Sequence, residues 1–436
     1  MQGYLLKAIG GYMVTNLFIK RKEVSITVVD SIMGSGKTSW AIQYMKNAPV
    51  YQKFMYITPF KTEVERVIAS VNRGFKQPDE DREGDTKLED VKRLIAAGEN
   101  IVSTHSLFKN IDREFIDLLE MENYTLILDE VMDVIEQVDI ATDDLKMLVE
   151  NKVIGLGKNG LVDWQQTDYK KGFFEKVRNL ANSGKLMMYE DKNKEPVALY
   201  RLFPVETFNC FERVFILTYM FDGQIQRAYF DLYGQKYVYK TVVKEGKDYN
   251  LASYVSFENE DRTHLKRMIN IYYLSPNDRK DMNKMGNRHN YFSVSDLKQK
   301  TASKDVRKVI KDNAYNYYRN KCTVPTDEVM WTTFKDYKDK LTPRGLKEQF
   351  VSVNARATNE FQHKSTCIYL ANIYMNPLTK HFFNKQGVEV NMNLFALSEL
   401  LQWIFRSRIR KGEPINIYIP SIRMRTLLEQ YLNNEI

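Results

Sequence analysis

An eight-residue stretch near the amino terminus, Ser31–Thr38, has the residue types that bind phosphate. It follows the β-branched run Ser25–Val29 and precedes a stretch of helical spacing, Thr38–Lys46. Glycines let the backbone turn so that successive N–H groups face a phosphate, and the start of the helix adds partial positive charge. Ser31 stands where the usual pattern has its first glycine. The stretch predicts a loop that binds the phosphates of ATP through Met33, Gly34, Ser35, Gly36, Lys37, Thr38 and Ser39.

Two neighbouring carboxylates supply a second chemical signal. The apolar run Leu126–Leu128 ends in Asp129 and Glu130, and strand ends of a parallel sheet face the ligand crevice. We predict that Thr38 and Asp129 hold Mg²⁺, that Lys37 contacts the β- and γ-phosphates, and that Glu130 activates the attacking water. Together these residues predict a nucleoside triphosphatase. The alternatives are a glycine-rich turn before an ordinary helix and a solvated strand end.

Short β-rich runs alternate with helical stretches on both sides of a tyrosine-rich segment, Gln226–Val243. Alternation of this kind is typical of parallel sheets covered by helices on both faces. In the first half, further strands are predicted at Phe54–Ile57, Asn100–Ser103 and Val214–Leu217. In the second half, they are predicted at Met268–Tyr273, Val329–Thr333, Thr366–Leu370 and Ile415–Ile419. The tyrosine-rich segment itself alternates in the manner of antiparallel strands.

Composition places the chain among soluble proteins of a reducing compartment. The 436 residues carry a net charge of +8, which is compatible with a nucleic-acid partner. Only 3 cysteines and 5 histidines occur, all scattered, so neither a disulfide framework nor a zinc site is expected. No apolar run approaches the roughly 18 residues that a membrane-spanning helix needs. We expect a cytoplasmic protein, in the host cytoplasm if the source is viral, without a membrane partner or a signal peptide.

Several segments resemble the motifs of superfamily 2 helicases, in particular those of phage-encoded members. The Asp129-Glu130-Val131 box resembles the family's acidic motif. Met55–Phe60 and Val102–His105 resemble its first two nucleic-acid-contacting motifs, which implies that Thr58, Thr104 and His105 hold strand phosphates without reading sequence. Simple strand capping is the alternative for the two threonines.

The second half of the chain carries the remaining resemblance. Trp331–Lys335 and Asn354–Asn359 fall where later family motifs lie, which implies that Lys335 and Thr358 contact nucleic acid. Gln402–Arg410 resembles the Gln-x-x-Gly-Arg-x-x-Arg motif, with Phe405 at the glycine and Ile409 at the last arginine. The resemblance implies catalytic roles for Gln402, Arg406 and Arg410, and Arg408 stays open as an alternative arginine finger.

The resemblance implies an α/β fold of two RecA-like P-loop domains with parallel sheets and a small β-rich linker. We predict an arm over residues 1–23, a first domain over 24–220, a linker over 221–265 and a second domain over 266–436. The expected activity is an ATP- and Mg²⁺-dependent helicase or translocase on single-stranded or forked DNA, with RNA as the other candidate. The alternatives are a terminase-type DNA-packaging ATPase and a nucleotide-switched binding module that does not hydrolyse. Base selectivity and oligomeric state stay open.

Overall fold

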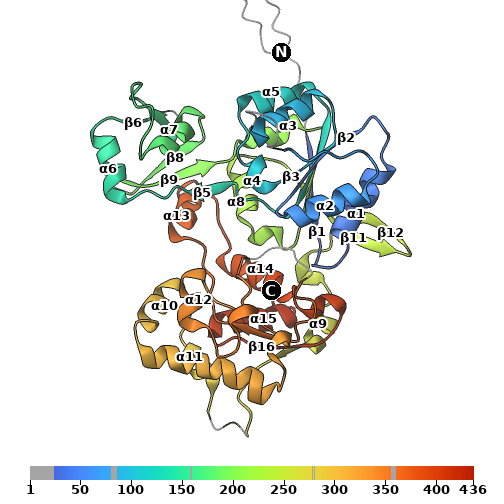
Figure 1. Cartoon of the computed structure of the whole chain (residues 1–436), viewed down its shortest axis with the longest axis vertical. Coiled ribbons are helices and arrows are strands. Elements are labelled where there is room, and N and C mark those ends of the chain that lie inside the picture. The colour runs from blue at the N-terminus through green and yellow to red at the C-terminus, as the bar shows by residue number, and fades with distance from the viewer. Residues whose placement is uncertain (1–23, 80–85, 158–159, 277, 279, 355–359) are drawn as a thin grey trace, which may run out of the picture.

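The computed structural model describes residues 24–79, 86–157, 160–276, 278, 280–354 and 360–436. The predicted arm over residues 1–23 and the predicted contact Thr358 lie outside this part. Two α/β domains are stacked along the long axis, and a smaller unit lies beside the first of them (Figure 1). The carboxyl terminus lies in the second domain (Figure 1).

The first domain is built on a seven-stranded sheet with the order β12-β11-β1-β10-β4-β2-β3. All neighbouring pairs are parallel except the hairpin of β11 and β12 at one edge. The strands predicted for this half are therefore confirmed. Their bounds are β1 (Ser25–Asp30), β2 (Lys53–Thr58), β3 (Ile101–Thr104), β4 (Tyr124–Asp129), β10 (Arg213–Thr218), β11 (Val238–Glu245) and β12 (Asp248–Ser253).

Helices cover both faces of this sheet because its strands are apolar on both sides. Val29 and Val28 alternate between the two faces, and each packs into a different buried cluster. One face is covered by α1 (Lys37–Asn47) and α2 (Lys61–Ser70). The other is covered by α3 (Lys87–Ala96), α4 (His105–Phe108), α5 (Arg113–Met121) and α8 (Ile225–Leu232).

The segment over 221–265 differs from the predicted linker. Its first part forms α8, whose Ala228, Tyr229 and Phe230 are buried against the sheet. Its second part, β11 and β12, belongs to the first sheet, where Val238 pairs with Thr27 of β1. The first domain therefore extends beyond residue 220, to at least the end of β12.

A small inserted unit, running from β5 to β9, separates β4 from β10 in the chain. It has its own core, in which Leu145 and Val177 pack against Leu186 and Leu199. The sequence did not predict this unit, because three of its five strands have only three residues. Its elements are β5 (Ile135–Gln137), α6 (Thr142–Glu150), β6 (Ile154–Leu156), β7 (Val162–Trp164), α7 (Glu175–Asn182), β8 (Leu186–Glu190) and β9 (Pro196–Leu202).

The second domain has a four-stranded, all-parallel sheet with the order β13-β16-β15-β14. The four predicted strands are confirmed as β13 (Ile269–Ile271), β14 (Val329–Thr332), β15 (Thr366–Tyr369) and β16 (Ile415–Tyr418). The helices of this domain are α9 (Thr263–Met268), α10 (Val294–Lys300), α11 (Lys304–Asn316), α12 (Lys338–Leu341), α13 (Pro377–Lys385), α14 (Met392–Ile404) and α15 (Ile422–Leu432).

None of the described helices in either domain or in the inserted unit is long and apolar enough to cross a bilayer.

Helix α13 leaves the second domain and packs against the first domain and the inserted unit (Figure 1). Phe382 and Phe383 belong to the first domain's buried cluster, and the Phe382 ring lies 5.4 Å from that of Tyr200 on β9. The Asn376 side-chain amide donates to Gln137 Oε1 at 2.9 Å. The two domains are therefore joined by a packed helix as well as by the chain between β12 and α9.

Candidate functional site

The carboxyl ends of three neighbouring strands, β1, β10 and β4, meet at one edge of the first sheet, beside the second domain. A cavity of about 290 Å³ lies at this edge. The second domain contributes Gln402, Phe405, Arg406, Arg410 and Gln362 to its wall. The first domain contributes Met33, Gly34, Gly36, Lys37, Thr38, Ser39, Glu63, Arg66, Asp129, Glu130 and Tyr249. Segments distant in sequence therefore face one another across a single cavity.

The loop after β1 has the backbone of a phosphate cradle. Gly34 and Gly36 have φ values of 86° and 98°, the left-handed region that glycine adopts without strain. Gly36 precedes α1, and its carbonyl accepts from Trp40 N at 2.8 Å. Of the seven residues predicted to bind the phosphates, Ser35 is absent from the cavity wall, and its buried Oγ has no hydrogen-bond partner among the described residues. The open start of a helix fits a bound phosphate.

Ser31, the residue in place of the usual first glycine, attaches this loop to the β11–β12 hairpin. Its hydroxyl accepts from Val242 N at 2.8 Å and lies 2.8 Å from the Thr241 hydroxyl. Ser31 is buried. A glycine could not make these contacts, so the departure has a structural reason.

The Lys37 side chain is hydrogen-bonded to the backbone of its own loop. Its ammonium donates to the carbonyl oxygens of Ser31 and, at 3.2 Å, of Ile32. Desolvation lowers the pKa of Lys37, and the negative charges of Glu130, Asp30 and Asp129 oppose that shift. A phosphate would offer this ammonium a charged acceptor in place of two neutral carbonyls.

Asp129 lies within reach of the loop. Its Oδ1 accepts from Thr38 Oγ1 at 3.4 Å, and its Oδ2 accepts from the Tyr56 hydroxyl at 2.8 Å. Burial and the neighbouring Glu130 raise the pKa of Asp129 to about 7. The Thr38 hydroxyl and the Asp129 carboxylate lie side by side, and both are oxygen ligands of the kind that Mg²⁺ prefers. Glu130 has a φ of 73°, an unusual conformation that turns the chain directly after the strand.

Asp30, at the end of β1, is a residue of this site that sequence reasoning missed. Its carboxylate accepts from the backbone N–H groups of Met220 and Phe221, both at 2.9 Å. Burial raises its pKa to about 7, against those two hydrogen bonds and Lys37. Asp30 therefore fixes the turn after β10 next to the loop after β1. The only sequence signal was a carboxylate ending an apolar strand.

The three candidate arginines have different surroundings. Arg406 is buried at 4% exposure and lines the cavity, together with Gln402. Arg410 also lines it, and its Cγ lies 4.0 Å from the position of a Cβ at Gly34. Arg408 is absent from the cavity wall, and its Nε donates to the Pro414 carbonyl at 2.6 Å. The structure therefore places Arg406 and Arg410, and not Arg408, opposite the loop.

The predicted nucleic-acid contacts are only partly brought together. Thr58 and Thr104 end adjacent strands and are paired in register, but Thr58 is fully buried. His105 lines a second cavity of about 620 Å³. Lys335 is exposed after β14 and lines neither cavity.

That second cavity lies where all three parts of the chain meet. The first domain contributes Pro59 and His105, the inserted unit contributes Glu136 and Arg201, and the second domain contributes Asn354, Phe395 and Glu399.

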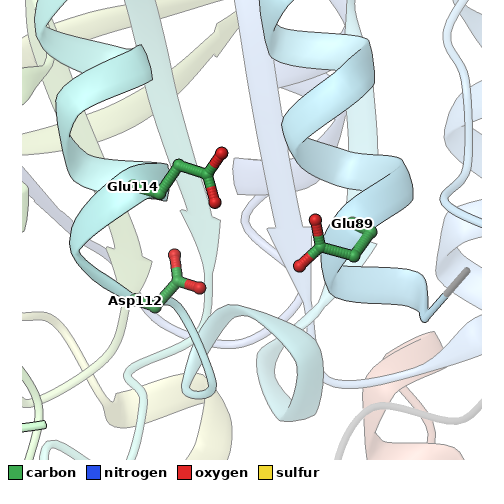
Figure 2. A group of neighbouring side chains, drawn as sticks. All are labelled: Glu89, Asp112 and Glu114. Atoms are coloured by element: carbon green, nitrogen blue, oxygen red, sulfur yellow. The ribbon is translucent and has the colours of Figure 1, made fainter.

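A group of three carboxylates, Glu89, Asp112 and Glu114, converges between α3 and α5 (Figure 2). The Lys92 ammonium lies 3.0, 2.7 and 2.6 Å from their oxygens. These hydrogen bonds raise the pKa of Lys92 despite its burial. The cluster therefore already holds a cation, the lysine itself, and we assign it a structural role.

The fold and site define a two-domain α/β protein, in which two RecA-like domains enclose a cavity beside a glycine-containing loop. Its sequence is 37% identical over 421 residues to the SPbeta prophage-derived protein YonV of Bacillus subtilis (strain 168), covering 94% of this chain and 99% of that one. The chain belongs to the YonV family. Residues 263–432 match the YonV C-terminal Rossmann-like domain, and residues 135–201 match the YonV middle domain. The middle domain corresponds to the inserted unit.

Helicases are among the solved structures to which this chain is similar. An apo XPD structure has a TM-score of 0.48 at 10% identity, and an XPD helicase structure has a TM-score of 0.41 at 11% identity. They cover 94% and 95% of this chain, and 96% of each XPD chain. The DUF1998 helicase MrfA bound to DNA and AMPPNP has a TM-score of 0.33 at 11% identity, with 94% of this chain and 48% of MrfA covered.

Proposed function

We propose that this protein is an ATP-dependent motor of the superfamily 2 helicase type, which couples ATP hydrolysis to movement along DNA. One observation carries the proposal. The Gly34–Ser39 loop, Asp129 and Glu130 of one domain face Gln402, Arg406 and Arg410 of the other across a cavity of about 290 Å³. Phosphoryl transfer needs this combination of backbone donors, carboxylates and cations from opposite sides.

Within this cavity the first domain would bind and orient the triphosphate. The N–H groups of the loop and the Lys37 ammonium bind phosphate oxygens, while Thr38 and Asp129 hold Mg²⁺. The metal, when bound, neutralises charge on the terminal phosphates. Glu130 orients the attacking water and accepts its proton.

The second domain would complete the site from the other side. Arg406 and Arg410 stabilise the negative charge that spreads over the transferring phosphoryl group. Gln402, on the last turn of α14, lies beside them. Because these residues belong to a different domain, binding of ATP draws the two domains together and product release separates them.

DNA would bind along the same edge of the first sheet. Thr104 ends β3 directly before His105, which lines the second cavity, and the buried Thr58 ends the neighbouring strand. The net charge of +8 favours a polyanion. Lys335 and Thr358 are proposed as contacts from the second domain. The prophage origin of the YonV relative favours a phage-encoded protein acting in the cytoplasm of its host.

The test is ATP turnover by the full chain with and without single-stranded DNA or RNA. We expect stimulation by a single strand, and loss of that stimulation at high salt, because phosphate contacts release counterions. Lys37→Ala and Glu130→Gln should each lower turnover by at least roughly a hundredfold. Turnover equal to that of the parent in both variants would exclude the proposed site.

Of the alternatives, a terminase-type enzyme gains no support. Its nuclease needs clustered carboxylates, but the described part of the second domain contains no group of three metal-ligating side chains. A non-hydrolysing module is separated by the same assay, since it would bind ATP without turnover on any polynucleotide.

A further inference from the structure

The half-buried Tyr249 lines the cavity of about 290 Å³ beside the Gly34–Ser39 loop, called the loop cavity below. It belongs to no motif identified in the sequence. It is the second residue of β12, and its ring lies directly against Gly36. A Cβ at Gly36 would clash with the Tyr249 ring, so this glycine is required by the tyrosine as well as by its φ of 98°. One half-exposed aromatic ring is therefore in contact with the turn that the phosphates would occupy.

The backbone of Tyr249 is held in place from helix α1. Gln43 Nε2 donates to the Tyr249 carbonyl at 3.1 Å, and Gln43 Oε1 accepts from the Tyr249 N–H at 3.0 Å. On the partner strand β11, the Ser31 hydroxyl accepts from Val242 N and lies against the Thr241 hydroxyl. The ring therefore stands on a rigid support, which reduces the ordering cost of binding a ligand against it.

The order of strands sets the direction in which a nucleotide would lie. The sheet places β4, with Asp129, on one side of β1, and places β11 and β12, with Tyr249, on the other. The terminal phosphate must point to Asp129 and Glu130, where the metal and water would be. The nucleoside end therefore leaves the loop on the side of Tyr249.

We infer that Tyr249 is the stacking platform for the base of the bound nucleoside triphosphate. The inference rests on the proposed nucleotide site and adds the subsite that holds its base. An aromatic face binds any base by stacking and reads no hydrogen-bond pattern. The side-chain amide of Gln43 binds the Tyr249 backbone through both its nitrogen and its oxygen, so it positions the ring and does not read the base. The subsite consequently accepts different bases, with ATP and GTP bound within a few-fold of each other.

The experiment compares a triphosphate ligand that carries a nucleoside with one that lacks it. Titration calorimetry on the full chain measures the Kd of Mg²⁺ with a non-hydrolysable ATP analogue, and of Mg²⁺ with inorganic tripolyphosphate. Tyr249→Ala and the bulkier Tyr249→Leu should weaken binding of the ATP analogue by about fivefold or more, because stacking on one aromatic side chain contributes about 1–3 kcal/mol. Tripolyphosphate should bind as in the parent, which also reports that each variant is folded.

Two further variants sharpen the result. Tyr249→Phe keeps the ring and should bind the ATP analogue more tightly than Tyr249→Leu does. Tyr51→Ala is the matched control, because Tyr51 is 84% exposed beside α1 and lies outside the loop cavity. An unchanged affinity of Tyr249→Ala for the ATP analogue, or an equal loss for both ligands, would overturn the inference. Failure of the parent to bind either ligand would instead overturn the proposed function beneath it.

Discussion

Arg406, Arg408 and Arg410 share one short stretch, yet Arg406 and Arg410 line the loop cavity and Arg408 does not. Arg406 is buried in its wall, and Arg410 lies over Gly34. Arg408 is turned toward the Pro414 carbonyl. The motif-like spacing could not separate them, because the 3₁₀ helix over Arg408–Lys411 sets the directions of Arg408 and Arg410.

This difference gives a paired prediction at the residue scale. Arg406→Ala should lower kcat for ATP hydrolysis by about a thousandfold, because an arginine finger contributes roughly 10³–10⁵ to the rate. Arg408→Ala, the matched control, should change kcat by no more than a few-fold. Steady-state turnover at saturating ATP measures both. A larger loss in Arg408→Ala than in Arg406→Ala would contradict this assignment.

Asp30 gives a prediction about pH. Its pKa is raised from 3.8 to about 7, so the folded state keeps a proton that the unfolded state releases at lower pH. The free energy of unfolding of the ligand-free protein should therefore fall as pH rises from about 4 to about 7, by at most about 4 kcal/mol from this group. Asp129, whose pKa is also raised to about 7, adds to the same slope.

Asp30→Asn removes one of these two titrating groups. We expect denaturant unfolding at several pH values within that window to show a shallower dependence in the variant than in the parent. Identical slopes would mean that Asp30 is not held protonated in the folded chain.

At the residue scale, the parts of the candidate site that could be predicted are those whose residues are adjacent in the sequence. The loop and the Asp129–Glu130 pair are read from consecutive residues, because each motif is a strand followed by a turn. Tyr249 and Asp30 could not be read in this way. Their partners, Gln43 and Met220, lie 206 and 190 residues away in the sequence.

At the scale of elements, the parallel strands were predictable and the shorter elements were not. Strands buried on both faces are continuous apolar runs, such as β1 and β4, and such runs are visible in sequence. The inserted unit has strands of three residues, too short for any alternation to be seen. The sequence pattern predicts strands where helix α8 lies, because its aromatic residues, Tyr229 and Phe230, also suit a sheet.

Helix α13 carries an element-scale prediction. Phe382 is 2% exposed in the first domain's cluster although its helix belongs to the second domain's chain. Phe382→Ala should lower the free energy of unfolding by about 3–5 kcal/mol and separate the unfolding of the two domains. Asn384→Ala, an exposed position on the same helix, should change it by less than about 0.5 kcal/mol. Calorimetry distinguishes one transition from two, and a single unshifted transition in Phe382→Ala would rule out this coupling.

At the scale of the whole molecule, the cavity is shared by two domains. A ligand that binds only the folded chain stabilises it by about 2.7 kcal/mol at a concentration of 100 Kd. We expect Mg²⁺ with a non-hydrolysable ATP analogue to raise the unfolding temperature of both domains together. The double variant Arg406→Ala, Arg410→Ala should confine that rise to the first domain. Calorimetric scans over a range of analogue concentrations measure this effect, and a rise shared equally by both domains of the double variant would contradict it.

The strand order of the first sheet also has a consequence during synthesis. Strand β10 lies between β1 and β4, but it is made after both of them and after the whole inserted unit. While the ribosome is still making that unit, β10 is missing from the centre of the sheet, and the facing edges of β1 and β4 are unpaired. Such edges invite pairing with other chains, and late non-local pairing slows folding. A nascent chain arrested before Arg213 should therefore depend on chaperones until the missing strand emerges.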